Sequence, residues 1–369
     1  MTSIDRDFGD LAVMRVPVKR AAYSRRTAWT MAILAELAYT PFDEESEQHI
    51  LDLAEELATL TDREKIADRL VKFRKTLGGL DGAPEAERRN QKLRAALACG
   101  GFQLVGSVLY DPGTDTQGFV AVRRDDEGTG MAVICFRGTT RIRDWMTNLD
   151  IAPQSIENPR TGAPIGNMHK GFHNAYRSVH GQIGERLKGL EDLPLYITGH
   201  SLGGALAVVA TWYQSSQRLA ACYTFGAPRV GDQGLIDRFK TPIYRIVNGP
   251  DPVSLVPPAG FGLEIVKAVF RVLGVFLPFW GWAAWVTDKL IRNQRFRHYG
   301  YMRYLTVAKP GPDGSYPALR LEFALSTLDR LARFIRLRTS GTGDRIDKYH
   351  DIARYRNKLR AHALRANRS

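Results

Sequence analysis

A serine lies between two glycines in "YITGHSLGGALA", where Gly199 to Gly203 spell the pattern GxSxG around Ser201. The apolar run before Gly199 is typical of a strand, and the small residues after Leu202 predict a closely packed helix. Glycines beside the serine suit a sharp strand-to-helix turn, because side chains at those positions would collide. We therefore expect the Ser201 hydroxyl to stand above a sheet edge, next to helix N–H groups that stabilise negative charge.

A serine hydroxyl becomes a good nucleophile only when a base removes its proton and an acid orients that base. Asp251 closely follows the apolar run "PIYRIVN", which places it at the carboxyl end of a predicted strand, where α/β sheets hold their ligands. Its competitor, Asp232 in "APRVGDQG", is better explained as the N-cap of a short helix. The sequence thus favours Asp251 as the acid.

Three histidines follow Asp251 in the chain. His298, in "RFRHYGYMRYL", stands just before a glycine and an aromatic strand, as expected of a loop residue that reaches back over a sheet edge. His350 and His362 fall in a basic helical tail, where a solvated helix face explains them. His298 is therefore the predicted base.

A negatively charged acyl-transfer intermediate needs a second N–H donor besides that of Leu202. The stretch "VICFRGTTRIRDW" offers one, since its predicted strand ends at Phe136 and Gly138 lets the backbone of Thr139 turn inward. The alternative is an ordinary turn with an incidental threonine. We expect Thr139 and Leu202 to form an oxyanion hole.

The elements that must position these residues alternate between strands and helices after residue 100. Short runs rich in β-branched and aromatic residues predict strands in "FQLVGSVLY", "GFVAVRR", "MAVICF", "LPLYITG", "ACYTFG" and "PIYRIVN". This alternation predicts an α/β fold whose mostly parallel sheet is flanked by helices on both faces. Before residue 100, a loose arm up to about Arg20 precedes helices predicted near 50–60, 66–77 and 84–98.

The chain is therefore divided into three parts. Residues 1–100 form a helical N-terminal extension packed on the catalytic domain, residues 101–310 form that α/β domain, and residues 311–369 form a basic, mainly helical segment. An apolar helical insertion at 263–291 interrupts the catalytic domain.

Six motifs in register between residues 101 and 307 resemble the class 3 lipases, the fungal-type triacylglycerol lipases of the α/β-hydrolase fold. They are "FRGTTRIRDWMTNL", "HKGFHNAY", "YITGHSLGGALA", "TFGAPRVGD", "VNGPDPVSLVPP" and "HYGYMRYL". The resemblance implies that Ser201, Asp251 and His298 form a catalytic triad, and that Thr139 and Leu202 form the oxyanion hole. It also implies a short helical lid at Ile142 to Asn148, with Trp145 on its apolar side.

The same resemblance implies a serine carboxyl-ester hydrolase that cleaves acylglycerols through an acyl-enzyme intermediate and needs no cofactor. Two alternatives stay open. One is a phospholipase A-type hydrolase on anionic membranes, which a basic surface would suit. The other is not an enzyme but a lipid-surface docking protein with a vestigial site.

Composition narrows the class of partner. Of 369 residues, 44% are hydrophobic and 25% charged, as in a globular protein with a sizeable core, and the net charge of +13 favours an anionic partner surface. The last 49 residues carry 12 Lys or Arg and 5 Asp or Glu. Without a glycine-aromatic RNA-binding signature or zinc-finger spacing, this charge points away from nucleic acid. A solvated basic helix face and a role on anionic membranes both stay open as explanations of the tail.

Three cysteines are too few for a disulfide framework, which favours a reducing compartment. The stretch "SRRTAWTMAILAELAY" superficially resembles an export signal, but Glu36 interrupts its apolar run and no small-residue cleavage site follows. We expect an amphipathic helix there, and a cytoplasmic or peripheral membrane protein rather than a secreted one.

The insertion at 263–291 contains 16 residues without a charge, Val272 to Thr287, which is shorter than the roughly 20 residues of a membrane-spanning helix. Its three tryptophans favour peripheral contact with a bilayer interface. The alternative is that these aromatic residues line the acyl pocket or pack under the N-terminal helices. His169 and His173 are spaced like metal ligands, but no third ligand is evident and no metal is expected.

Overall fold

The computed structural model of the protein describes residues 3–14, 22–40, 83–124, 129–139, 152–157, 161–216, 218–255, 296–323, 325–326, 329, 332–333 and 346–368. The helices predicted near 50–60 and 66–77, the lid at 142–148 and the insertion at 263–291 lie outside these residues.

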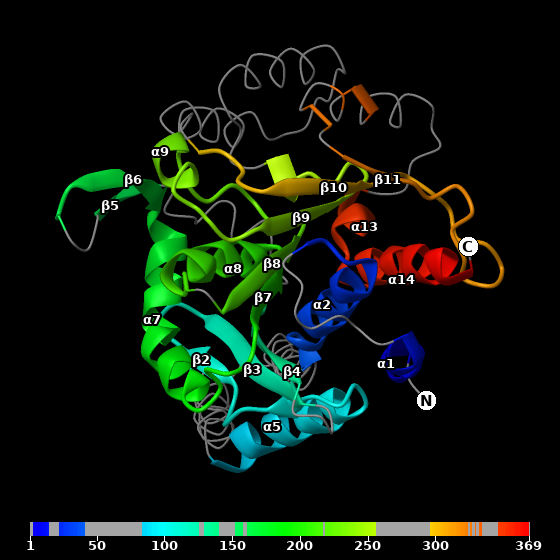
Figure 1. Ribbon diagram of the computed structural model, residues 1–369, viewed down its shortest axis with the longest axis horizontal. Coiled ribbons are helices and arrows are strands. Elements are labelled where there is room, and N and C mark those ends of the chain that lie inside the picture. Colours follow the sequence, from blue (N-terminus) through cyan, green and yellow to red (C-terminus); the bar gives the residue numbers. More distant parts are fainter. Residues whose placement is uncertain are drawn as a thin grey trace, which may run out of the picture.

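A nine-stranded sheet forms the centre of the fold (Figure 1). Its spatial order is β1-β3-β4-β7-β8-β9-β10-β11, with β2 beside β3. The strands are β1 (Gln103–Leu104), β2 (Leu109–Asp111), β3 (Thr116–Arg124), β4 (Gly130–Phe136), β7 (Leu195–His200), β8 (Leu219–Phe225), β9 (Ile243–Asn248), β10 (Tyr301–Leu305) and β11 (Leu321–Glu322). A separate two-stranded ribbon pairs β5 (Pro153–Glu157) with β6 (Pro164–His169).

The five strands from β4 to β10 in this order run parallel, which confirms the predicted α/β architecture. Their carboxyl ends therefore share one edge, where loops from different strands meet. All six strand-forming stretches predicted from the sequence contain strands of the sheet.

Helices cover both faces of the sheet (Figure 1). They are α1 (Ser3–Met14), α2 (Arg25–Leu37), α5 (Ala83–Ala98), α7 (Lys170–Leu187), α8 (Leu202–Tyr213), α9 (Gln233–Ile236), α13 (Ile346–His350) and α14 (Ile352–Arg368), with a 3-10 turn, η2, at Val253–Leu255. The predicted helix at 84–98 is confirmed as α5, and Asp232 caps α9 by accepting a hydrogen bond from the N–H of Leu235, as predicted.

Alternate residues of the central strands separate two cores. In β4, Val133 and Cys135 pack with α2 and α14, whereas Ile134 and Phe136 pack with α7 and α8. Burial on both faces explains why these strands read as continuous apolar runs. The Cys135 and Cys222 thiols are buried and free, and burial raises the pKa of Cys222 to about 12.

The expectation of a loose arm up to Arg20 is wrong for its first part, because α1 is a helix. Phe8, Leu11 and Met14 are buried in the same core as α2 and α14. Tertiary packing of these three side chains stabilises a helix whose own sequence pattern is weak.

The C-terminal helix is tied to the N-terminal helices by ion pairs. Arg356 is buried and contacts Asp7 of α1 and, at 2.6 Å, Glu36 of α2. Arg360 lies 2.7 Å from Asp10 of α1. The explanation of the basic tail as a solvated helix face is thus wrong for these two arginines, because carboxylates at the other end of the chain neutralise them.

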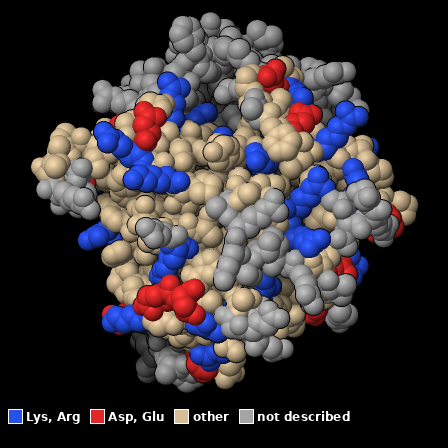
Figure 2. Space-filling view, in the orientation of Figure 1, with Lys and Arg blue, Asp and Glu red and all other residues tan. Residues whose placement is uncertain are grey.

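The surface charge of the described residues is mixed. On the face shown in Figure 2, Lys and Arg side chains are interspersed with Asp and Glu rather than gathered in one patch. Within the described ranges, no helix has the length and apolar content needed to cross a bilayer.

We predict that Arg356→Ala lowers the free energy of unfolding by about 3–5 kcal/mol, because it removes the cation between two mostly buried carboxylates. Urea denaturation measures this loss. The control is Arg94→Ala, which breaks an ion pair with Glu87 in which both side chains are more than 40% exposed, and should cost about 1 kcal/mol or less. Equal losses of unfolding free energy in the two variants would contradict a stabilising role for the Arg356 ion pairs.

Candidate active site

Ser201 forms the turn between the end of β7 and the start of α8. Its backbone has φ 57° and ψ −126°, which is a strained conformation for a residue other than glycine. A Cβ atom at Gly199 would collide with the backbone of Gly203, and a Cβ atom at Gly203 would collide with that of Phe136. The predicted turn is confirmed, together with the reason for its glycines.

The loop after β4 passes beside Ser201, because β4 and β7 pair in parallel and end side by side. A Cβ atom at Gly138 would lie 3.0 Å from the Cβ of Ser201. Thr139 follows directly, and the N–H of Leu202, in the first turn of α8, has no acceptor within its own helix. The structure thus brings both predicted oxyanion residues to the serine turn, while their role stays a prediction.

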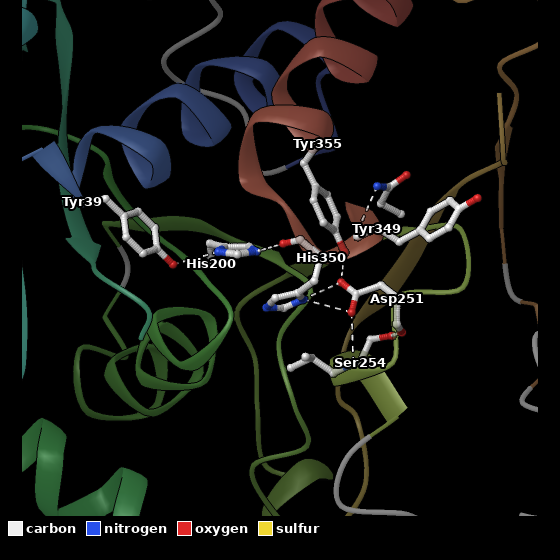
Figure 3. Close-up of polar contacts among 9 residues, drawn as sticks. Tyr39, His200, Asp251, Ser254, Tyr349, His350 and Tyr355 are labelled. Atoms are coloured by element: carbon white, nitrogen blue, oxygen red, sulfur yellow. Dashed lines mark hydrogen bonds and ion pairs between the residues drawn. The ribbon is translucent and has the colours of Figure 1, made fainter. Parts of the chain in front are cut away.

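Asp251 lies buried just beyond β9, at the carboxyl edge of the sheet. The Nδ1 atom of His350 lies 2.9 Å from each of its carboxylate oxygens (Figure 3). The Tyr355 hydroxyl and, at 2.9 Å, the N–H of Val253 also donate to this carboxylate. Because Nδ1 donates to Asp251, the neutral ring keeps Nε2 unprotonated and able to accept a proton.

The structure does not bring His298 to Asp251, so the predicted pairing is wrong. β10 runs parallel to β9, and Tyr301 lies opposite Tyr244, near the amino end of β9. The chain just before β10 therefore starts beside the amino end of β9, and the His298 side chain reaches the turn after Asp251 without contacting its carboxylate. His298 instead donates from Nε2 to the carbonyl oxygen of Ser254, 2.7 Å away.

The histidine that sequence reasoning set aside, His350, ends α13 and is only 4% exposed. A signal for it was present in the sequence. Ile352, Tyr355 and Leu359 repeat at helical spacing and are all buried, so they mark a helix face that packs against the core. The many arginines and lysines of the tail obscured this pattern.

Two polar atoms at this edge are buried without a hydrogen-bond partner among the described residues: Ser201 Oγ and His350 Nε2. In a serine–histidine pair, the proton passes between these two atoms. The ring centroid of His350 lies 4.5 Å from that of His200, which directly precedes Ser201. The site therefore holds a histidine, oriented by an aspartate, beside the strand end that presents the serine.

His169 and His173 have partners of their own. The His169 ring stacks on Phe172 with centroids 4.1 Å apart, and His173 Nε2 lies 2.8 Å from the Tyr213 hydroxyl. In the part of the chain that the structure describes, no three His, Cys, Asp or Glu side chains are grouped to hold a metal ion.

The structure has a strained serine turn between strand and helix, beside an aspartate–histidine pair at the carboxyl edge of a mostly parallel sheet. This arrangement is that of the α/β-hydrolase fold. Residues 133–261 match the family model of Lipase (class 3). Over this stretch, which is less than half of the chain, the sequence is similar to the class 3 lipases.

The chain is 37% identical over 161 residues to a lipase of Rhizomucor miehei, covering 40% of this chain and 42% of that protein. It is 32% identical over 167 residues to a secreted mono- and diacylglycerol lipase of Fusarium solani, covering 43% of this chain and 48% of that protein. It is 34% identical over 168 residues to a chloroplastic phospholipase A(1) of Arabidopsis thaliana, covering 38% of each. The chain thus spans less than half the length of these relatives. The solved Rhizomucor miehei lipase propeptide complex covers 63% of each chain at 24% identity, with a TM-score of 0.42.

Gly226 lies against the aspartate–histidine pair and has φ +57°. A Cβ atom there would lie 2.5 Å from Asp251 Oδ2 and 3.0 Å from His350 Cε1. We predict that Gly226→Ala destabilises the protein by about 3 kcal/mol or more, since it adds overpacking to the backbone strain of a left-handed residue.

The matched control is Gly189→Ala, because Gly189 has φ +76° with open space around it and should cost only the strain of about 1–2 kcal/mol. Urea denaturation of both variants gives the difference. A Gly226→Ala loss no larger than that of the control would show that the pair tolerates displacement.

Proposed function

We propose that the protein is a serine carboxyl-ester hydrolase whose nucleophile, base and orienting acid are Ser201, His350 and Asp251. The observation that carries the proposal is the bonding of His350. Its Nδ1 is held 2.9 Å from both carboxylate oxygens, while its Nε2 and the Ser201 Oγ are buried without partners among the described residues.

In the proposed reaction, Nε2 of His350 takes the hydroxyl proton as Ser201 Oγ bonds to the acyl carbon. The negative charge that moves to the carbonyl oxygen is stabilised by the N–H groups of Leu202 and Thr139. His350 then gives its proton to the departing alcohol, which leaves an acyl-serine. Water, deprotonated by the same nitrogen, releases the fatty acid and restores the serine.

The proposed substrates are acylglycerols. The support comes from two relatives, whose names describe a lipase and a mono- and diacylglycerol lipase. A second candidate is a phospholipase A-type activity on anionic membranes, favoured by the phospholipase A(1) relative and by the net charge of +13.

We predict that Ser201→Ala and His350→Asn each lower kcat for p-nitrophenyl butyrate by about 10³-fold or more, whereas His298→Asn stays within about threefold of wild type. Steady-state hydrolysis measures all three, and melting temperatures show that the variants fold. The opposite order for the two histidines would contradict the assignment of the base.

The substrate class is tested with emulsified tributyrin and with vesicles of anionic phospholipid, using Ser201→Ala as the control in each assay. We expect fatty-acid release mainly from tributyrin. Release from the vesicles alone would favour the phospholipase. If the wild type hydrolyses none of the ester substrates, the result would favour the docking protein with a vestigial site.

We further propose that the segment from Val272 to Thr287 contacts lipid surfaces at their interface. The support is its sequence, in which Trp280, Trp282 and Trp285 occur in an uncharged stretch. Deletion of residues 276–285 is expected to abolish flotation with anionic liposomes and to leave cleavage of soluble p-nitrophenyl butyrate measurable. Unchanged flotation would contradict the contact.

A further inference from the structure

A buried histidine links the N-terminal extension to the main chain of His350. His200 Nε2 lies 2.6 Å from the carbonyl oxygen of His350, and His200 Nδ1 lies 2.8 Å from the Tyr39 hydroxyl (Figure 3). Tyr39 follows α2, whereas His200 is the last residue of β7. Neither side chain has a part in the reaction proposed above.

The direction of these hydrogen bonds follows from their chemistry. A carbonyl oxygen only accepts, so Nε2 of His200 carries a hydrogen and donates it to His350. Burial, followed by the neighbouring His350, lowers the pKa of His200 well below its ordinary value, so the ring is neutral and Nδ1 is bare. The Tyr39 hydroxyl therefore donates to Nδ1. Two successive hydrogen bonds thus run from the Tyr39 hydroxyl through the His200 ring to the His350 carbonyl oxygen.

The main chain at His350 needs such support. Tyr349 and His350 are the last residues of α13, and the final carbonyl groups of a helix have no donor within it. Asn248, at the end of β9, supplies one donor, since its Nδ2 lies 2.9 Å from the Tyr349 carbonyl oxygen. Lys358 in turn fixes the Asn248 side chain through its Oδ1 at 2.7 Å. Side chains from two strand ends thus hold the two carbonyl groups next to the base.

We propose that Tyr39 and His200 are positioning residues that hold the His350 backbone so that its imidazole meets Ser201. The proposal rests on the function proposed above. A general base must be placed within a few tenths of an ångström of its productive position, and a side chain cannot be placed better than its own backbone. The N-terminal extension, through Tyr39, therefore contributes to the geometry of the reaction.

The first test compares the kinetics of four variants on p-nitrophenyl butyrate. Tyr39→Phe removes the donor to His200 and is expected to lower kcat about 10-fold with little change in KM, because a positioning role acts on the base and not on substrate affinity. His200→Leu removes both hydrogen bonds and is expected to lower kcat about 100-fold. His200→Gln should stay within about threefold of wild type, since its amide offers one acceptor and one donor at a similar spacing.

Tyr23→Phe is the matched control. Tyr23 lies in the same N-terminal part of the chain, and its hydroxyl is buried without a hydrogen-bond partner among the described residues. This variant should keep the wild-type kcat. If Tyr39→Phe also keeps it, the proposal is overturned. If His200→Leu does not fold, the comparison of Tyr39→Phe with Tyr23→Phe still decides.

The second test does not depend on activity. The Nδ1–H proton of His350, bonded to Asp251, is expected as a downfield NMR resonance that is absent in His350→Asn. Tyr39→Phe should shift or broaden this resonance, and Tyr23→Phe should not. An unchanged resonance in Tyr39→Phe overturns the positioning role and leaves the proposed function standing. A changed resonance in a protein that cleaves no ester supports the positioning role, although the proposed function would then fail.

Discussion

The hydrogen bond between Asp251 and His350 is the interaction on which the rest of the structure depends. It joins residues 99 positions apart in the chain, and both side chains are buried. A buried carboxylate is costly unless donors surround it, and here an imidazole, the Tyr355 phenol and the Val253 N–H supply those donors. The fold must therefore bring the end of β9 and the start of α14 to one point and keep them there.

The two ends of the chain cooperate in this. α14, which begins just after His350 and carries Tyr355, lies beside α2 (Figure 1), and its Arg356 is bound to both N-terminal helices. On the sheet side, the buried ammonium group of Lys358 donates to Asn248 and to the carbonyl oxygen of Thr306, 2.8 Å away. The N-terminal extension and the basic tail are thus parts of the structure that holds the proposed catalytic centre.

Local features of the site could be predicted from the sequence, and long-range ones could not. The serine turn depends on neighbouring glycines, and Asp251 follows a clear strand, so the turn and the place of Asp251 in the fold were predicted correctly. The partner of Asp251 depends on where distant strands and helices lie. His298 precedes a strand, as expected, but that strand begins beside the amino end of β9. His350 was set aside because its segment is rich in cations. The carboxylate partners of one of them, Arg356, lie some 320 to 350 residues earlier in the chain.

The central claim is that His350 is the base that serves Ser201. A crystal structure of the protein after reaction with an alkyl phosphonate ester, which forms a covalent adduct with an activated serine, tests it most directly. The account predicts an adduct on Ser201 Oγ, with His350 Nε2 about 3 Å from that oxygen and the phosphonyl oxygen bound by the N–H groups of Leu202 and Thr139. An adduct on Ser201 with another histidine at that distance, or no adduct on Ser201, would contradict it.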